Sequence, residues 1–209
     1  MQAICPLCST LSEVFFTKVE VYYKCETCHS IFLDEKAKPN EVDEKKRYEL
    51  HDDDTNDDGY RKFISPITSS IMKDFKVEDE GLDFGAGNSA IISVILEESG
   101  YNTTKYDPYF HNFPELLEKK YDYISSCEVI EHFYNPHKEF KLLKSMLKEG
   151  SKLYLMTAVY NEKINFATWY YKNDPTHVFF YSQKTFEWIK NEFGFKSLHV
   201  DKKLIILEN

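Results

Sequence analysis

Three groups of residues in this sequence have types and spacings that suit chemistry, and the first is a set of cysteines. Cys5, Cys8, Cys25 and Cys28 follow the pattern C-x2-C-x16-C-x2-C, which is typical of a four-thiolate zinc site. Between the pairs, "EVFFTKVEVYYKCE" favours a hairpin that brings the four sulfurs together, as in a zinc ribbon. Four protein ligands fill the shell of Zn²⁺, so we expect a structural site, with Cys28 a better fourth ligand than His29.

The second group is a glycine-rich turn at residues 82–90, "LDFGAGNSA". Gly85 and Gly87 would let the backbone approach either a dinucleotide or S-adenosylmethionine closely. Asp107, 22 residues after Gly85, would hold ribose hydroxyls in both cases. Asp83 separates the two, because its carboxylate would repel a pyrophosphate and attract the ammonium of S-adenosylmethionine. The sequence therefore favours S-adenosylmethionine.

The third group is "EVIEH", in which Glu128, Glu131 and His132 stand at i, i+3 and i+4. On a helical turn they would face one way, and with His177 they would form a site for Mg²⁺ or Mn²⁺ that lowers the pKa of a substrate hydroxyl. Without a metal, His132 or His177 would act as general base. A structural role, in which these side chains cap a helix and fix a loop, is the third possibility. Cys127 fits a small buried residue better than a nucleophile.

Strands and helices alternate from Gly81 onward, and they must position these groups. The chain predicts an α/β fold, with a Rossmann-like, mostly parallel sheet, flanking helices and an antiparallel C-terminal hairpin. A helix over "GYRKFISPITSSIMKDF" precedes the first strand, a later helix is expected to end at Gly150, and another begins at Ser182. In such a sheet, ligands bind at the carboxyl ends of the strands.

The turn and the strands after it resemble the class I S-adenosylmethionine-dependent methyltransferases, in the branch similar to ubiquinone-biosynthesis O-methyltransferases. The matching segments, "LDFGAGNS", "YDP", "YDYISSCEVIEHFYNPHKEFKLLKSMLKEGSKLYLMT" and "DPTHVFFYSQKTFEWIKNEFGF", lie within residues 81–195. The resemblance implies a cofactor loop at Asp83, Gly85 and Gly87, a ribose contact at Asp107, and Cys127 and Glu128 near the adenine or the reacting centre. "EVIEH" with the later histidine is also similar to the metal site of small-RNA 3′-end 2′-O-methyltransferases.

The sequence departs from this family at two points. Ser89 replaces the usual third glycine of the loop. The chain between Asp107 and Tyr121 is short, so we expect the sheet to lack one edge strand, and with it the usual adenine-contacting acid. The Pro-Pro tetrapeptide of N-methyltransferases that act on exocyclic base amines is absent, which disfavours base N-methylation.

The resemblance and the cysteine pattern together predict three parts. These are a zinc ribbon at residues 1–38, an acidic linker or flap at 39–60, and a Rossmann-like methyltransferase domain at 61–209. An aromatic stretch in the last part has two equal explanations, a substrate lid or packing against the ribbon. Its members are Tyr160, Phe166, Trp169, Tyr170, Tyr171, Phe179, Phe180 and Tyr181.

Charge and hydropathy limit the partners. The net charge of −9 disfavours nucleic acid, because binding a phosphate backbone takes clustered Lys and Arg. No apolar run is long enough to span a membrane, and "MQAICPLCST" lacks the pattern of a secretion signal. We therefore expect a cytoplasmic enzyme that acts on a dissolved small molecule, with a protein partner for the ribbon left open.

We expect the enzyme to methylate an oxygen of a small molecule, metabolite or glycan, with His132, His177 and Glu131 at the reacting centre. Three alternatives stay open: carbon methylation of a nucleotide-linked sugar, methylation of RNA, and a zinc-ribbon binding module without turnover.

Overall fold

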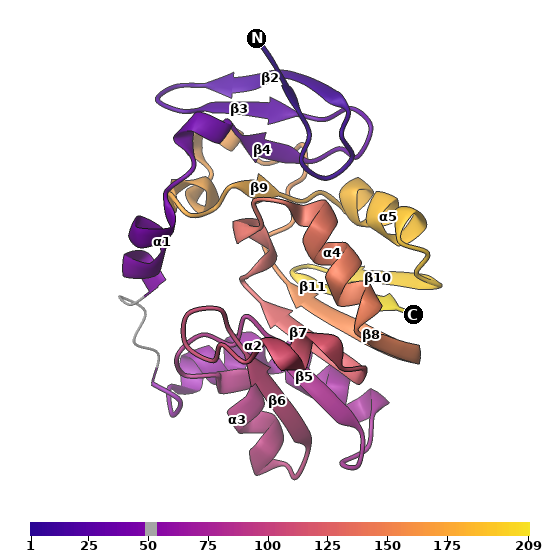
Figure 1. Cartoon of the computed structure of the whole chain (residues 1–209). Coiled ribbons are helices and arrows are strands. Elements are labelled where there is room, and N and C mark those ends of the chain that lie inside the picture. The colour runs from indigo at the N-terminus through magenta and orange to yellow at the C-terminus, as the bar shows by residue number, and fades with distance from the viewer. Residues whose placement is uncertain (49–53) are drawn as a thin grey trace.

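The computed structural model describes residues 1–48 and 54–209 and contains two sheets, one above the other in Figure 1. The acidic linker predicted at 39–60 lies partly outside the described residues, because 49–53 are not among them. Its described part includes a helix that the sequence did not predict, α1 (Glu41–Tyr48). Among the described helices, none combines the length and apolar character that crossing a membrane requires.

The large sheet has six strands and confirms the predicted fold class. In spatial order they are β10 (Ser197–Asp201), β11 (Leu204–Glu208), β8 (Leu147–Met156), β7 (Tyr121–Cys127), β5 (Glu80–Phe84) and β6 (Asn102–Tyr106). The last four are parallel, whereas β10 and β11 form the expected antiparallel hairpin. β6 ends the sheet, and residues 107–120 form loop and a 3-10 turn (Pro114–Glu118). The edge strand expected to be missing is therefore absent.

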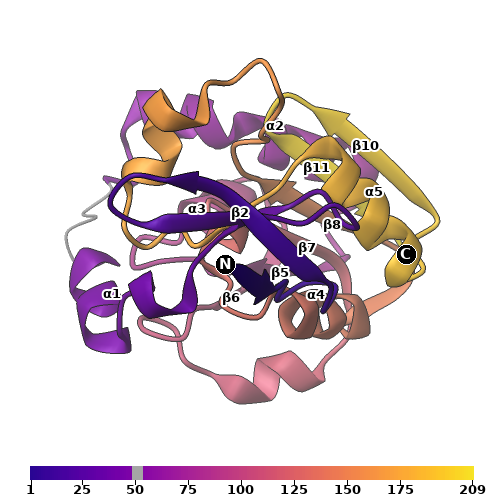
Figure 2. The ribbon, with the colours of Figure 1, turned by 90° about the horizontal axis from the view of Figure 1, so that it is seen from above.

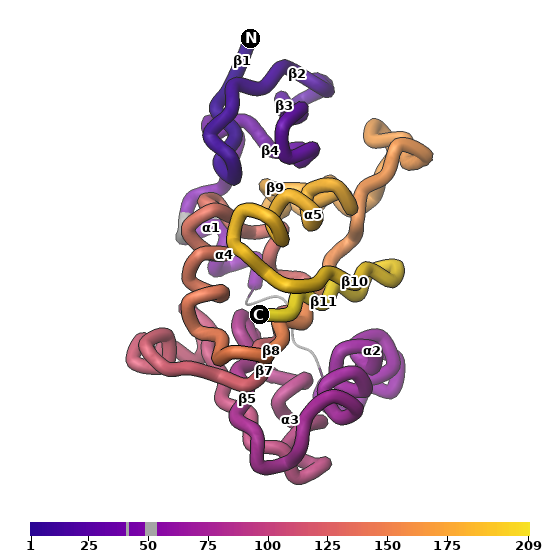
Figure 3. The backbone as a smooth tube through the Cα atoms, turned by 90° about the vertical axis from the view of Figure 1, so that its right-hand side faces the viewer, coloured from indigo at the N-terminus to yellow at the C-terminus, as the bar shows by residue number. Residues whose placement is uncertain are grey.

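Helices cover both faces of this sheet because its strands are apolar on both sides. Tyr123 of β7 packs with α2 (Asp58–Asp74) and α3 (Ile91–Glu98) on one face. The next residue, Ile124, packs with α4 (Pro136–Ser145) and α5 (Gln183–Glu192) on the other. Figure 3 shows the two pairs of helices on opposite sides of the strands.

Capping residues predicted one helix start correctly and one helix end wrongly. Ser182 caps α5, as predicted, in a capping box with Thr185. The prediction that the preceding helix ends at Gly150 is wrong, because α4 ends at Ser145 and β8 begins at Leu147. Gly150 has a φ of 73° and lies in an irregular stretch of β8, where the pairing with β7 shifts register. Glycine at this position therefore permits the β-bulge and does not end a helix.

The small sheet joins the N-terminus to a much later segment. Its strands, in spatial order, are β1 (Gln2–Ile4), β2 (Leu11–Thr17), β3 (Val21–Lys24), β4 (Ile31–Leu33) and β9 (Phe179–Phe180), all antiparallel. The first four belong to residues 1–38, called the ribbon below. Figure 1 shows β9 between the ribbon and the large sheet. Figure 2, seen from above, shows β2 of the ribbon crossing over the large sheet.

The aromatic stretch packs against the ribbon, which decides between its two explanations for most of its members. The ring of Phe166 lies 5.1 Å from Tyr22, 5.4 Å from Phe15 and 5.7 Å from Phe180, centroid to centroid. Seven of the eight aromatic residues are buried, and Tyr170 is exposed. These rings therefore form a core between the ribbon and the rest of the chain.

Candidate active site

The glycine-rich turn follows β5 at the carboxyl edge of the large sheet. Gly85 has a φ of 75°, and a Cβ there would lie 2.6 Å from Cγ2 of Val129, so packing alone requires glycine. Gly87 has a φ of 65°, but a Cβ there would meet no atom within 4 Å. The backbone at Gly87 thus borders open space, as a cofactor loop requires.

Asp107 ties this turn to the loop after β6. Its Oδ2 accepts the backbone N–H of Gly87 at 3.0 Å, and its Oδ1 accepts those of Tyr109 at 2.8 Å and Phe110 at 3.1 Å. The side chain is buried. A carboxylate can accept about four hydrogen bonds, so acceptor capacity remains for a ribose hydroxyl.

Asp83 lies deeper than the sequence argument implied. Its carboxylate accepts the hydroxyls of Ser93 and Ser125, each at 3.1 Å, and the N–H of Ser93 at 3.3 Å. Burial raises the pKa of this carboxyl to about 6. These three bonds join α3 and β7 to β5, so Asp83 stabilises the glycine-rich turn from inside the fold.

The next strand end carries Cys127 and Glu128. Burial raises the pKa of the Cys127 thiol well above its usual range, as expected of a packed residue rather than a nucleophile. Glu128 has a φ of 52°, uncommon for a non-glycine residue, and its Oε1 lies 3.2 Å from Nζ of Lys203. Sequence reasoning missed Lys203, although the antiparallel pairing of Leu204 with Met156 brings the hairpin turn to this edge.

Glu131, His132 and His177 form a compact cluster at the same edge. One ligand atom from each lies within 4.8 Å of the others. Glu131 is fully buried, and its carboxylate accepts hydrogen bonds from Thr157, at 3.1 Å, and from the Tyr171 hydroxyl. His177 Nε2 lies 4.0 Å from Glu131 Oε1.

Glu128 is outside this cluster, which corrects the expectation that it shares a helical face with Glu131 and His132. The helical turn is a short 3-10 helix, Ile130–His132, that begins two residues after Glu128. The positive φ of Glu128 turns its side chain toward Lys203 instead. The structure thus groups three of the four predicted ligands.

Both histidines are oriented by backbone carbonyls. His132 Nδ1 lies 2.9 Å from the carbonyl oxygen of Thr176, and His177 Nδ1 lies 2.6 Å from that of Tyr171. Each Nδ1 therefore carries the proton and donates it, which leaves Nε2 as the acceptor in the neutral ring. This arrangement is typical of metal-binding and base histidines.

Electrostatics keep the cluster close to a change of protonation at neutral pH. Burial, reinforced by the charge of Glu128, raises the pKa of Glu131 to about 7. Burial also lowers the pKa of His177, although Glu131 partly opposes this effect. His177 is therefore neutral at pH 7, with a lone pair on Nε2.

Helix α1 covers the cluster. The Tyr48 ring meets the His132 ring edge to face at 5.3 Å. Arg47 donates two hydrogen bonds, of 3.1 and 2.9 Å, to Asp174 Oδ2, three residues before His177. Sequence reasoning missed these contacts because it interpreted residues 39–60 as an acidic linker or flap and predicted no helix there.

The sulfurs of the four ribbon cysteines lie together. Sγ of Cys5 is 3.5 Å from that of Cys28, and Sγ of Cys8 is 3.3 Å from that of Cys25. In a tetrahedral site with Zn–S bonds of about 2.3 Å, sulfurs are about 3.8 Å apart. The Ser30 hydroxyl lies 3.2 Å from the Cys28 sulfur, where it could support a thiolate. The donor set fits structural Zn²⁺.

Comparison with known proteins identifies the family. A family described as "Methyltransferase domain" matches residues 57–200. The chain belongs to this family. Family and fold together confirm the prediction of an S-adenosylmethionine-dependent methyltransferase. A search of the curated proteins finds no match.

Solved methyltransferases share the fold at low sequence identity. A SAM-dependent methyltransferase from Archaeoglobus fulgidus is 17% identical, with a TM-score of 0.53 over 71% of this chain and 94% of that one. Human N-acetylserotonin methyltransferase in complex with SAM is 11% identical, with a TM-score of 0.53 over 72% of this chain and 53% of that one. Mitomycin 7-O-methyltransferase is 12% identical, with a TM-score of 0.51 over 74% and 58%. The match therefore spans little more than half of the last two enzymes.

The donor set of the cluster limits which metal this methyltransferase could hold. Two imidazoles and one carboxylate suit a transition metal ion better than Mg²⁺, which prefers oxygen ligands. The donor set of Glu131, His132 and His177 would therefore suit Mn²⁺ better than Mg²⁺.

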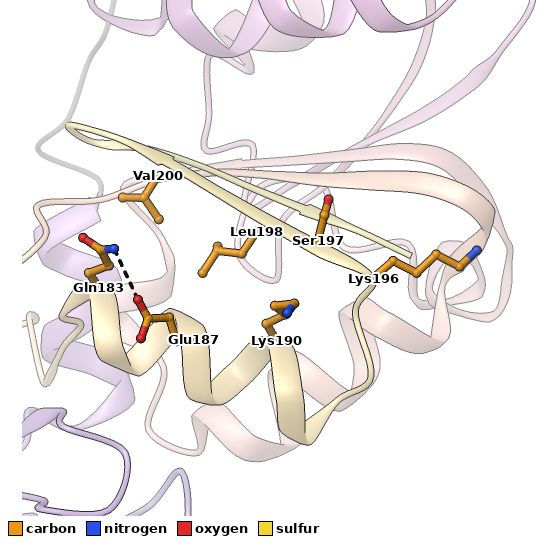
Figure 4. A pocket seen from close by; sticks show the side chains of 7 residues that line it. All are labelled: Gln183, Glu187, Lys190, Lys196, Ser197, Leu198 and Val200. Carbon is orange, nitrogen blue, oxygen red and sulfur yellow. Dashed lines mark hydrogen bonds between the residues drawn. The ribbon is translucent and has the colours of Figure 1, made fainter.

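A groove elsewhere on the methyltransferase shares no residue with this edge. It has a volume of about 430 Å³ and lies between α5 and β10, where Lys190 and Lys196 border it (Figure 4). Glu187 within it accepts a hydrogen bond from Gln183. Its lining is exposed or half-buried, and it contains none of the predicted site residues.

Proposed function

We propose that this methyltransferase, of the branch similar to ubiquinone-biosynthesis O-methyltransferases, transfers the methyl group of S-adenosylmethionine to an oxygen of a small molecule, metabolite or glycan. The observation that carries the proposal is the cluster of buried Glu131 with half-buried His132 and His177 beside the glycine-rich turn. The two features are in contact, because Gly85 packs against Val129, two residues before Glu131.

In this proposal the cofactor occupies the turn. The open backbone at Gly87 admits it, Asp107 accepts its ribose hydroxyls, and Asp83 and Gly85 shape the loop. Cys127 and Glu128 border the adenine or the reacting centre. The carboxylates at this edge, with Lys203 as counterion to Glu128, favour a cofactor that carries a sulfonium and an ammonium.

The reaction needs a base and alignment. Nε2 of His132 or His177 takes the proton of the acceptor hydroxyl, and the oxygen attacks the methyl carbon. The carbon–sulfur bond breaks with its electron pair on sulfur, so S-adenosylhomocysteine leaves. In the alternative in which Glu131, His132 and His177 hold Mn²⁺, both Nε2 lone pairs would be occupied by the ion, and its positive charge rather than a histidine base would lower the pKa of the acceptor hydroxyl. Thr157 and Tyr171 keep the Glu131 carboxylate in place.

The ribbon would hold Zn²⁺ through Cys5, Cys8, Cys25 and Cys28. Thiols that bind metal rather than form disulfides are typical of a reducing compartment, which supports a cytoplasmic enzyme. The acceptor would then be a dissolved small molecule, and the acidic balance of the chain disfavours a nucleic acid.

Calorimetric titration of the full-length, zinc-loaded protein tests the cofactor. We expect micromolar binding of S-adenosylhomocysteine and none of NAD⁺. Asp107→Ala should weaken binding more than tenfold, whereas Asp122→Ala, which removes a carboxylate paired with Lys148 at the other end of β7, should leave it unchanged. The absence of S-adenosylhomocysteine binding would contradict the proposal and favour a binding module.

The acceptor is tested next, by screening hydroxylated small molecules with labelled S-adenosylmethionine. His132→Gln should lower kcat at least a hundredfold on any acceptor found. Methylation at carbon or nitrogen, or of RNA in preference to small molecules, would contradict the assignment to oxygen.

A further inference from the structure

The ribbon and the candidate active site share one segment, residues 176–182, which contains β9. On its ribbon side, Ile31 pairs with Phe180 and Phe32 with Phe179. The N–H of Leu33 donates to the carbonyl of Val178 at 2.9 Å.

The same segment is bonded directly to a cysteine knuckle. The Ser182 hydroxyl donates to the carbonyl of His29 at 3.0 Å, and His29 follows Cys28. His29 itself has a φ of 57°, an unusual conformation for histidine. The geometry of the knuckle therefore sets where this end of the segment lies.

On its other side, the segment holds the turn that carries Glu131 and His132. The N–H of Val178 donates to the carbonyl of Glu131, and the Tyr181 hydroxyl donates to that of Ile130, both at 2.9 Å. His132 Nδ1 donates to the carbonyl of Thr176.

Residues 176–182 are tightly packed between the ribbon and the turn that carries Glu131. Val178, Tyr181 and Ile130 are at most 1% exposed. Val178 is bonded to the ribbon through its carbonyl and to Glu131 through its N–H, and His177 precedes it directly. Packed interiors transmit such displacements rather than absorb them.

We infer that the ribbon positions the Glu131, His132 and His177 cluster through β9, with Val178 and Tyr181 as positioning residues. Metal in the thiolate site fixes the knuckle and β4, these fix residues 176–182, and that segment fixes both histidines. The inference rests on the proposed function only for the role of the cluster, because the coupling itself is a property of the fold. The hydrogen bonds of the glycine-rich turn run to Tyr106 and Asp107 at the end of β6 instead, so cofactor binding should depend less on the ribbon than the two histidines do.

The test records NMR signals of the His132 and His177 rings in full-length protein with ¹³C-labelled histidine. The signals are assigned with His132→Gln and His177→Gln. Spectra are compared between zinc-loaded protein and protein treated with a chelator, and between wild type and Tyr181→Phe. S-adenosylhomocysteine affinity is measured by calorimetry for each sample.

A matched control exists in Tyr121→Phe. The Tyr121 hydroxyl is also buried and donates to a carbonyl, that of Leu116, at 2.9 Å, but it lies outside β9. Both variants lose one buried tyrosine hydrogen bond of the same kind. A general loss of stability would therefore affect the two equally.

We expect zinc removal and Tyr181→Phe each to shift the ring signals of both histidines. S-adenosylhomocysteine affinity should stay within twofold in these samples. Tyr121→Phe should shift neither ring signal. Unchanged ring signals in Tyr181→Phe and in folded, zinc-free protein would overturn the inference. If zinc removal unfolds the whole chain, the comparison of Tyr181→Phe with Tyr121→Phe decides alone. A failure of wild-type protein to bind S-adenosylhomocysteine would count against the proposed function and leave the ring signals as an independent result.

Discussion

Asp83 and Asp107 end neighbouring parallel strands, yet their surroundings differ. Asp83 is bonded to two serine hydroxyls and one backbone amide, and its pKa is raised to about 6 by burial. Asp107 is bonded to three backbone amides from two loops. The first carboxylate therefore joins secondary-structure elements, and the second closes the glycine-rich turn at which we propose that the cofactor binds.

Asp83→Asn should flatten the pH dependence of stability. Folding raises the pKa of this carboxyl from 3.8 to about 6, so the folded protein holds the proton more tightly than the unfolded chain. The resulting stabilisation is complete below about pH 4 and is lost as pH rises through 6. It amounts to about 3 kcal/mol, and it should be missing from the variant when urea unfolding is measured from pH 4 to pH 8.

Asp122→Asn provides a control of opposite sign. Burial alone would raise the pKa of Asp122, but hydrogen bonds from Lys148 and the Glu80 amide lower it. Wild type gains stability from this group as pH rises, so the variant should lose stability at neutral pH and not at low pH. Identical pH profiles for wild type and Asp83→Asn would show that the carboxyl is not buried as described.

Gly87→Ala should separate cofactor binding from stability. Gly87 and Gly150 have φ values of 65° and 73°, and a Cβ added at either residue would meet no atom within 4 Å. Alanine at either position costs about 1 kcal/mol of backbone strain. Because only Gly87 lies in the turn after β5, Gly87→Ala alone should also weaken S-adenosylhomocysteine binding, about tenfold by calorimetry. Equal S-adenosylhomocysteine affinities of Gly87→Ala and Gly150→Ala would show that the cofactor does not bind at this turn.

At the scale of elements, the regular parts were predictable and the short parts were not. The periodicity of Ile64, Ile67 and Ile71 predicted α2, and Ser182 predicted the start of α5, because each signal is local. β9 has two residues and exists because β4 pairs with it, which no local pattern reveals. α1 is polar on most of its surface, and its contacts with Asp174 and His132 are remote in sequence.

The candidate site was predictable to the same extent. The spacing of "EVIEH" found Glu131 and His132, and the histidine of "DPTHVFF" joins them in space. Glu128 was assigned to the cluster on the assumption of a regular helical turn, which its positive φ breaks. Lys203, Thr157 and Tyr171 were missed because they reach the site through tertiary packing.

The segment around Phe166 should behave as a core element. Phe166→Ala removes a ring that is 4% exposed and contacts residues of both the ribbon and β9. We expect a loss of about 3–5 kcal/mol in the free energy of unfolding. Tyr170→Ala, at a ring that is 66% exposed, should change it by less than about 0.5 kcal/mol. Similar small losses in both variants would restore the lid explanation.

On the scale of the whole molecule, segments remote in sequence converge on one edge of the large sheet. The ribbon contributes β4, the helix after it covers His132, and the C-terminal hairpin brings Lys203 to Glu128. Figure 1 shows α1 descending from the ribbon along the side of the molecule. The N-terminal part therefore covers His132 on one side, through the Tyr48 ring at the end of α1.

Arg47→Ala should loosen α1 over the cluster. Arg47 is bonded twice to Asp174, whose pKa burial alone would raise but hydrogen bonds from Thr176 and Arg47 lower. The bond to this half-buried carboxylate should contribute about 1 kcal/mol, so amide hydrogen exchange in α1 should become about fivefold faster. Lys46→Ala is the matched control, because Lys46 is 70% exposed and lies 4.0 Å from Asp43.

The same pair of variants shows whether opening of α1 limits access. If it does, product release should become faster in Arg47→Ala. The KM for the acceptor should fall or stay the same. Exchange in α1 that is equally fast in Arg47→Ala, Lys46→Ala and wild type would show that Asp174 does not hold the helix. The ribbon would then be coupled to the cluster through β9 without help from α1, since the bonds of Val178 and Tyr181 do not involve this helix.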